Sequence, residues 1–190
     1  KAKYQIKNTN NKESQFQMLQ KLELKKKYHP KLIRYSKKKK IKFLSTAFSI
    51  EDMKFLINKC NLDIIKIPSG EITNYPYLKF LAKFNKIILM STGMANIKEI
   101  KFAFKTLIKN GTKKQNIYIL HCITEYPANN SKLNLRAIEY LREKLNTNQV
   151  GYSDHSTSLL APSIAVSLGA KVIEKHFTLN KKMNGPDHKA

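Results

Sequence analysis

Short apolar runs and longer amphipathic stretches alternate along most of this chain. The short runs are rich in Ile, Leu and Val, whereas the longer stretches repeat their apolar residues at helical spacing. The runs that predict strands are 3–6, 41–46, 63–67, 86–90, 116–120, 150–152 and 171–173. Helices are predicted over 49–59, 75–84, 96–110 and 135–145, and a further helix is closed by Gly169.

Apolar residues occupy both alternating sets of positions in these strands, which indicates burial of both sheet faces. Strands of this kind that alternate with helices are typical of a parallel α/β protein. Polar residues end nearly every strand, as in a barrel, whereas an open doubly wound sheet concentrates its ligands at one switch point. We therefore expect a TIM (β/α)8-type barrel that lacks its first βα unit. Residues 1–190 would form one partial barrel of strands 2 to 8.

The predicted strand ends carry cations, hydroxyl groups and imidazoles, with few carboxylates. They are Lys3, Thr46, Lys66 with Ser69 and Glu71, Ser91-Thr92-Gly93, His121 with Thr124 and Tyr126, Ser153-Asp154-His155, and His176. In a barrel these groups face one pocket. Lysines, hydroxyls and backbone N–H groups suit a phosphate or phosphate-ester anion. Histidines suit a divalent transition metal, which can polarise a carbonyl group.

Two of the strand ends share one pattern, because each carries a histidine after a short apolar run. His155 ends one strand and His176 ends the next, with a helix and Gly169 between them. In a parallel βαβ unit both carboxyl ends open onto the same face, so the two imidazoles form a plausible pair of metal ligands. The alternative is that each histidine is a strand-end residue whose ring nitrogens bond to the backbone.

Lys66 lies inside an apolar strand, and a buried ammonium group needs an anionic partner. That partner is either Glu71 or a ligand, and the pair could also be purely structural. Other candidates have plainer explanations as well. Ser69 and Ser91 could cap the helices that follow them. Glu71 could begin a helix, and Asp187 could form a turn after Gly-Pro.

The formal net charge is +23, from 36 Lys and Arg against 13 Asp and Glu. Such a charge raises nucleic acid as a partner, but only three of the 36 residues are arginines and the lysines are scattered over the whole chain. Nucleic-acid readers usually rely on the bidentate fork of arginine and on interleaved aromatic residues. The charge therefore favours an anionic small-molecule substrate over nucleic acid.

No run of 18 apolar residues exists, so we expect no membrane span and no membrane partner. The two cysteines, Cys60 and Cys122, do not make a disulfide framework. Reduced, buried thiols are the default in the cytoplasm, which is the predicted location.

Several motifs, in order along nearly the whole chain, resemble those of the bacterial N-acetylneuraminate (sialic acid) synthase family. They are 66–74 (KIPSGEITN), 91–94 (STGM), His121-Cys122 with Glu125-Tyr126-Pro127, 152–155 (YSDH), 174–178 (EKHFT) and 185–188 (GPDH). The resemblance implies a TIM-barrel enzyme that condenses phosphoenolpyruvate with an N-acetylated amino sugar and water. With N-acetylmannosamine the products would be N-acetylneuraminate and phosphate.

Carried over to this sequence, the resemblance assigns a metal to His155 and His176. Mn²⁺ is the expected ion, with Mg²⁺ or Co²⁺ as alternatives. It implies that Glu71 is a catalytic carboxylate beside the condensing carbons, with Lys66 as the second catalytic residue. The residues implied to hold the phosphate or carboxylate of phosphoenolpyruvate are Lys3, Thr46, Lys66, Ser69, Ser91 and Ser153.

Two further residues, Tyr126 and Asp187, match groups around the sugar. Thr124 takes the phosphate contact that an Asn makes in many members of the family. The family's first strand, with a sugar-binding Glu, would precede Lys1, and its C-terminal antifreeze-like domain is absent from the 190 residues. We therefore expect this stretch alone to be inactive or very weak, and the full-length protein to be a homodimer.

Two alternatives to an N-acetylneuraminate synthase stay open. The first changes only the sugar, toward legionaminic or pseudaminic acid, and Ser69-Gly70-Glu71 followed by Thr73-Asn74 favours the sialic or legionaminic branch. The second is a basic nucleic-acid-binding module, which predicts salt-sensitive binding to unspecific DNA or RNA.

Overall fold

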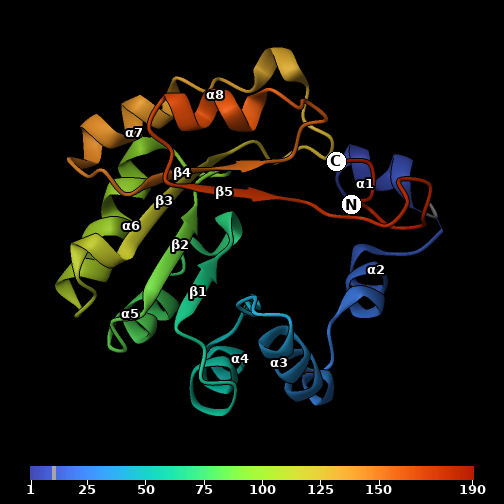
Figure 1. The fold of residues 1–190 in the computed structure, drawn as a ribbon, viewed down its shortest axis with the longest axis horizontal. Coiled ribbons are helices and arrows are strands. Elements are labelled where there is room, and N and C mark those ends of the chain that lie inside the picture. The colour runs from blue at the N-terminus through green and yellow to red at the C-terminus, as the bar shows by residue number, and fades with distance from the viewer. Residues whose placement is uncertain (10–11) are drawn as a thin grey trace.

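The centre of the molecule is a parallel sheet with the strand order β1-β2-β3-β4-β5. The computed structural model describes residues 1–9 and 12–190. The strands are β1 (Ile64–Ile67), β2 (Ile87–Ser91), β3 (Ile117–Cys122), β4 (Val150–Asp154) and β5 (Val172–Lys175). Each strand pairs with the next one along the chain, as expected for repeated βαβ units. Figure 1 shows all five strands running in one direction through a curled sheet.

Helices connect the strands and cover the outside of the curl. The helices are α1 (Lys3–Asn8), α2 (Gln15–Leu22), α3 (His29–Lys38), α4 (Ile50–Lys54), α5 (Tyr75–Ala82), α6 (Ile97–Lys109), α7 (Ala137–Leu145) and α8 (Ala161–Ser167). A π-helical turn over Phe55–Lys59 extends α4. Short 3₁₀ turns lie at Lys26–Tyr28, Ser69–Glu71, Lys114–Asn116 and Asn130–Lys132. In Figure 1, α5 to α8 lie outside the curl, and both termini lie toward the end to which the strands point.

Local capping chemistry explains where several helices begin. The Ser49 hydroxyl accepts a hydrogen bond from the backbone N–H of Asp52 at 3.0 Å, as the sequence predicts for the start of α4. Asn96 and Glu99 form a reciprocal capping box at the start of α6. Pro76 lies in the first turn of α5, where its missing N–H costs no helical hydrogen bond. The predicted helices and the strands from residue 63 onward are confirmed, with ends that shift by a few residues.

The two faces of the sheet differ in burial. Fully buried side chains face the helices, namely Ile65, Ile67, Ile88, Met90, Ile117 and Ile119. The alternate positions are half-buried at Ile64, Lys66, Ile87, Leu89 and Tyr118, but Ser91, Leu120 and Ser153 among them are buried. We call the side that these positions share the concave face. The prediction that both faces are buried therefore holds around Leu120 and Ser153 and fails toward β1 and β5, which do not pair within the described residues.

Two predicted strands are wrong. Residues 3–6 are helical, because Gln5 returns its side chain to the backbone N–H of Ala2 and closes the first turn of α1. Residues 41–46 are extended but make only one bridge, between Thr46 and Lys66. Ile41 is 63% exposed, so this segment contributes little of its apolar surface to the core.

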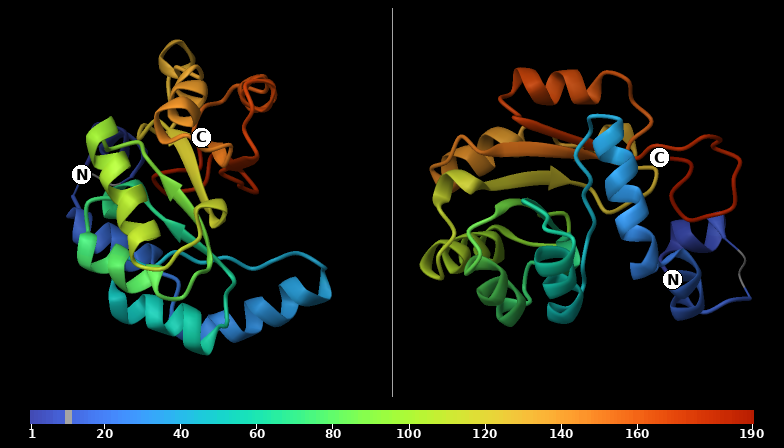
Figure 2. Two further views of the ribbon diagram at one scale, coloured as in Figure 1. Left: turned by 90° about the vertical axis from the view of Figure 1, so that its left-hand side faces the viewer. Right: turned by 60° about the horizontal axis from the view of Figure 1, so that its bottom comes forward.

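The C-terminal segment lies beside α1. Asn8 Nδ2 donates to the backbone oxygen of Pro186 at 2.8 Å, and the right-hand view of Figure 2 shows the red C-terminal loop next to the blue first helix. Across residues 1–9 and 12–190, no helix combines the length and apolar character that a membrane crossing needs.

A cavity of about 620 Å³ lies between α2, α3 and the segment 45–48. Its lining is mostly apolar, and the buried ring of His29 also faces it. Of the predicted site residues only Thr46 contributes to this lining. The polar groups that follow the other strands gather elsewhere, on the concave face.

Candidate active site

Strand alternation brings polar side chains from four strands to one place on the concave face. Lys66 Nζ on β1 donates to Ser91 Oγ on β2 at 2.8 Å and lies 3.5 Å from Glu174 Oε1 on β5. Ser153 Oγ on β4 donates to the same oxygen of Glu174 at 2.6 Å. Cys122 on β3 lies between them in the register, and burial raises the pKa of its thiol, so the thiol stays protonated near neutral pH. The strand ends thus form one connected network.

Lys66 has a carboxylate partner, but this partner differs from the predicted one. The sequence pointed to Glu71 or a ligand, whereas the structure pairs the ammonium with Glu174. Only 13% of the Lys66 side chain is exposed, against 37% for Glu174. The Glu174 carboxylate therefore lies between a buried cation and solvent, where an incoming anion would meet the same cation.

His155 holds one defined tautomer. Its Nδ1 lies 2.6 Å from the backbone oxygen of Ile123, and a carbonyl oxygen can only accept, so Nδ1 carries the hydrogen. Its Nε2 therefore has a free lone pair, 3.2 Å from Ser153 Oγ. Burial lowers the pKa of the imidazole, with a smaller contribution from the nearby His176, although the bond to Ile123 and the charge of Glu174 act in the opposite direction. A neutral imidazole whose other nitrogen bonds to a carbonyl is the usual state of a metal-ligating histidine.

The second imidazole lies next to the first. The ring centroids of His155 and His176 are 5.3 Å apart, with 73° between their planes. Tyr126 stacks on His155 at 4.1 Å and meets His176 edge-on at 5.2 Å. Burial raises the pKa of the Tyr126 phenol, which stays neutral. The two imidazoles therefore lie next to each other, as the strand pattern predicts.

The donor set suits a divalent transition metal in chemical type. Two adjacent imidazoles, one of them neutral with a free Nε2, are ligands that such ions prefer. Within the described residues no group of three or more His, Cys, Asp or Glu side chains forms a ready metal cage. The histidine pair could therefore supply two ligands, and water or substrate oxygens would have to complete the coordination.

Asp187 approaches the same site from the C-terminal segment. Its Oδ1 is buried and has no hydrogen-bond partner among the residues that the structure describes. Burial raises the pKa of this carboxyl, although His176 and His188 act in the opposite direction. Asn8 holds the loops around it, since its Nδ2 also lies 3.3 Å from the backbone oxygen of Tyr126.

The comparisons with known proteins agree with this picture. The sequence model described as the NeuB family matches residues 1–190, which is the whole chain. The chain belongs to the NeuB family.

Two relatives of known name are similar over the whole chain. This NeuB-family chain is 57% identical over 190 residues to the N,N′-diacetyllegionaminic acid synthase of Campylobacter jejuni. It is 40% identical over 192 residues to the enzyme of the same name from Legionella pneumophila. Both alignments span the whole chain, but they cover 56% and 53% of the relatives, so the chain spans a little over half of their length.

A solved structure supports the fold. An N-acetylneuraminic acid synthetase from Leptospira borgpetersenii, crystallised with citrate, superimposes with a TM-score of 0.84 at 34% identity. The match covers 91% of this chain and 59% of the solved one. The parallel order and the curl of the sheet are those of a partial (β/α)8-type barrel, as predicted from the strand pattern.

The remaining predicted site residues of this NeuB-family chain lie at different distances from the network. Thr46 bridges to Lys66 and so lies beside it. Glu71 Oε2 accepts from Asn74 Nδ2 at 2.7 Å, in the turn that leads into α5. Ser69 begins the same turn, and Thr124 follows β3, next to Gly93. Lys3 is an exposed residue of α1, so the argument that placed it at a strand end is wrong.

His121 is a strand-end histidine whose ring bonds to the backbone, as in the alternative to metal binding. Its Nε2 lies 2.7 Å from the backbone oxygen of Leu133, and only 8% of the residue is exposed. Burial lowers the pKa of its ring, although the bond to Leu133 acts in the opposite direction. His121 is therefore a structural residue, separate from the His155–His176 pair.

Two residues of the site, Glu174 and Asn8, are not among the predicted site residues. Glu174 enters the sequence analysis only within the motif 174–178, although alternation along a strand ending at residue 175 places it on the same face as Ser153. That signal was present in the sequence. Asn8 had no such signal, because its two partners lie 118 and 178 positions away.

Proposed function

We propose that this chain is the substrate- and metal-binding part of a sugar acid synthase that condenses phosphoenolpyruvate with an N-acetylated amino sugar. The observation that carries the proposal is the network from Lys66 through Glu174 and Ser153 to His155, with His176 beside it. It joins a cationic anion-binding end to an imidazole end across a few ångströms. The NeuB-family membership and the relatives' names support the same reaction class.

The product that we favour is N,N′-diacetyllegionaminic acid. From the sequence motifs alone, N-acetylneuraminate is the first expected product and legionaminic or pseudaminic acid the second. The relatives at 57% and 40% identity both carry the legionaminic name, which supports the second reading over the first. The sugar substrate would then bear two acetamido groups, as the prefix N,N′-diacetyl indicates.

In the proposed reaction, a C–C bond forms between C3 of phosphoenolpyruvate and the aldehyde carbon of the open-chain sugar. The aldehyde oxygen takes up a proton and becomes a hydroxyl group. Water adds at C2 and loses its protons, and the bond between C2 and the phosphate oxygen breaks, so that C2 becomes a ketone and phosphate leaves. Lys66 would hold the phosphate or carboxylate of phosphoenolpyruvate, and the hydroxyls of Ser91 and Ser153 would orient it. Glu71 would transfer a proton as a general acid or base, or stabilise the cation that develops at C2.

The imidazole end would meet the sugar. His155 and His176 would hold a divalent ion, with Mn²⁺ our first choice, and a bound ion would polarise the aldehyde as a Lewis acid. Tyr126 stacks on His155 and meets the exposed His176 edge-on, so its ring lies beside both imidazoles. The buried oxygen of Asp187 would accept a hydroxyl hydrogen of the sugar.

Calorimetry with Mn²⁺ tests the proposal. The parent chain, shown by circular dichroism to be folded, is compared with His155→Ala, His176→Ala and the remote control His29→Gln. We expect binding by the parent and the control, and no binding by the two site variants. Equal binding by all four folded proteins would refute the two-histidine site.

A second titration tests the favoured product. The chain loaded with Mn²⁺ and phosphoenolpyruvate is titrated with N-acetylmannosamine and, separately, with the sugar that bears two acetamido groups.

A further inference from the structure

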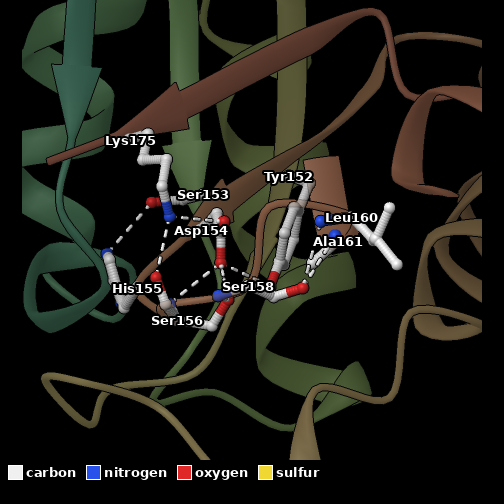
Figure 3. A network of polar contacts seen from close by, with 9 residues as sticks. All are labelled: Tyr152, Ser153, Asp154, His155, Ser156, Ser158, Leu160, Ala161 and Lys175. Atoms are coloured by element: carbon white, nitrogen blue, oxygen red, sulfur yellow. Dashed lines mark hydrogen bonds and ion pairs between the residues drawn. The ribbon is translucent and has the colours of Figure 1, made fainter. Parts of the chain in front are cut away.

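An ion pair lies directly before the two histidines in sequence. Lys175 Nζ donates to Asp154 Oδ2 at 2.7 Å, and Asp154 and Lys175 are register partners in the last rung of the β4–β5 ladder. His155 and His176 are the next residues of the two strands. Figure 3 shows Lys175 reaching across to Asp154 and to the turn that follows it.

Asp154 also anchors the turn that carries His155. The carboxylate is fully buried, and its Oδ1 accepts from the hydroxyl of Tyr152 at 3.0 Å. The same oxygen accepts from the backbone N–H and the hydroxyl of Ser156, at 2.9 and 2.7 Å. Lys175 Nζ in turn donates to the backbone oxygen of Ser156 at 2.8 Å. His155 is therefore held between two residues that are bound to each other and to the neighbouring strand.

These groups lie behind the site rather than in it. Successive side chains of a strand point to opposite faces. Ser153 and His155 point to the concave face, as their contact shows. Asp154, between them, points to the helix-facing side, where Tyr152 is also buried. The ion pair can therefore influence the metal ligands only through the backbone.

The Lys175–Asp154 ion pair matters more for β5 than for the inner strands. In the part of the chain that the structure describes, β5 is an edge strand that pairs with β4 alone. Burial would raise the pKa of the Asp154 carboxyl, but hydrogen bonds from Lys175, Ser156 and Tyr152 outweigh burial and lower it. Removal of Lys175 would leave a fully buried carboxylate without its cation, which favours a shift of the strand ends.

We propose that Asp154 and Lys175 are positioning residues that set the separation of His155 and His176 for a divalent metal ion. The inference rests on the proposed function for the metal itself. The geometric part, the placement of the two imidazoles, is independent of whether a metal binds.

Three substitutions test the role of the pair. Lys175→Met keeps most of the side-chain length but removes the ion pair, and Lys175→Arg restores the charge. Tyr152→Phe is a milder change that removes one hydrogen bond to Asp154 and keeps the packing. Lys86→Met is the matched control, because Lys86 Nζ lies 3.0 Å from Asp63 Oδ1 and joins β1 to β2 at the opposite end of the strands.

The first measurement is Mn²⁺ affinity by calorimetry, together with the visible spectrum of bound Co²⁺. Substitution of groups that bond directly to metal ligands typically weakens metal binding by about 10- to 100-fold. Because Lys175 acts on the ligands through the backbone, we expect the lower end of that range, about tenfold, for Lys175→Met. Lys175→Arg should recover most of that loss, Tyr152→Phe should fall between, and Lys86→Met should match the parent. An unchanged affinity and Co²⁺ spectrum in folded Lys175→Met would overturn the proposal. An equal loss in Lys86→Met would do the same, because it would indicate general loosening.

The second measurement needs no metal. Ring signals of ¹⁵N-labelled histidines, assigned with the His→Ala variants, report the surroundings of each imidazole. We expect the signals of His155 and His176 to move in Lys175→Met and Tyr152→Phe, and those of His29 and His188 to stay. Unmoved signals of the pair overturn the inference even if the parent binds Mn²⁺. If the parent does not bind Mn²⁺ but the His155 and His176 signals still move in the variants, the proposed function is refuted and the positioning role stands.

Discussion

Ser153 gives its single hydroxyl hydrogen to Glu174, at 2.6 Å, and so leaves the Nε2 lone pair of His155 uncapped although that nitrogen is only 3.2 Å away. A hydroxyl can donate only once, so the carboxylate and the imidazole compete for it. The hydroxyl donates to Glu174 because a charged acceptor makes the stronger hydrogen bond. The carboxylate thus keeps the imidazole nitrogen available for another partner.

The first prediction follows from this competition. In Glu174→Ala the Ser153 hydroxyl should turn to His155 Nε2, and Mn²⁺ must then break that bond. A net hydrogen bond contributes about 1 kcal/mol, so we expect roughly fivefold weaker Mn²⁺ binding by calorimetry. Ser153→Ala in the Glu174→Ala background should restore most of the affinity. Absence of this rescue would show that Glu174 acts through its charge alone.

Lys66→Met should weaken the binding of phosphoenolpyruvate by at least about tenfold, because a buried cation contributes a strong charge-assisted bond to an anion. The measurement is calorimetry at fixed ionic strength. Lys86→Met removes a lysine of similar exposure at the other end of the strands and should bind as the parent does. Similar losses in both variants would indicate that overall charge, rather than this site, attracts the anion.

Stability should fall as the pH drops through the ordinary histidine range. Burial lowers the pKa of folded His121 below its unfolded value. Below about pH 6.5 the unfolded chain therefore takes up a proton that the folded chain refuses, and the free energy of unfolding falls by up to about 1.4 kcal/mol per pH unit. Urea unfolding of His121→Gln should show a shallower slope than the parent between pH 7 and 5.5. Parallel slopes would mean that His121 titrates equally in both states.

Two glycine substitutions should separate packing from chain flexibility. A Cβ at Gly151 would lie 2.5 Å from Leu120 Cδ2 and 2.6 Å from the backbone oxygen of Val172, whereas a Cβ at Gly70 would meet no atom within 4 Å. We expect Gly151→Ala to lower the free energy of unfolding by about 1–3 kcal/mol. Gly70→Ala should change it by less than about 1 kcal/mol. Equal urea midpoints for the two variants would contradict the close packing of β4 between its neighbours.

Much of the fold could be predicted because its signals are local. The apolar strands from residue 63 onward and the caps at Ser49 and Asn96 each depend on a few residues that are close together in the sequence. Residues 3–6 were predicted wrongly, because four alternating residues fit a helix turn as well as a strand. The helix is closed by the side chain of Gln5 and by backbone bonds such as that from Ile6 to Ala2.

The candidate site was predictable as a set of strand ends but not as a set of pairs. Alternation brings Lys66, Ser91, Ser153 and the two histidines together, as expected. The choice of Glu174 over Glu71 as the partner of Lys66 depends on the curl of the sheet, which places β5 within reach of β1. No local pattern encodes that curvature.

The β4–β5 register has a consequence for how the gene can change. Asp154 and Lys175 are level with each other, and alternate positions of a strand point to opposite faces. The gain or loss of a single codon within the β5 segment would turn the residue before His176 to the wrong side and the imidazole away from its partner. A change of two codons would restore the facing. The loop between α8 and β5 can change in length more freely, because residues added there leave the alternation within β5 intact. The number of residues within β5 is therefore as constrained as their type.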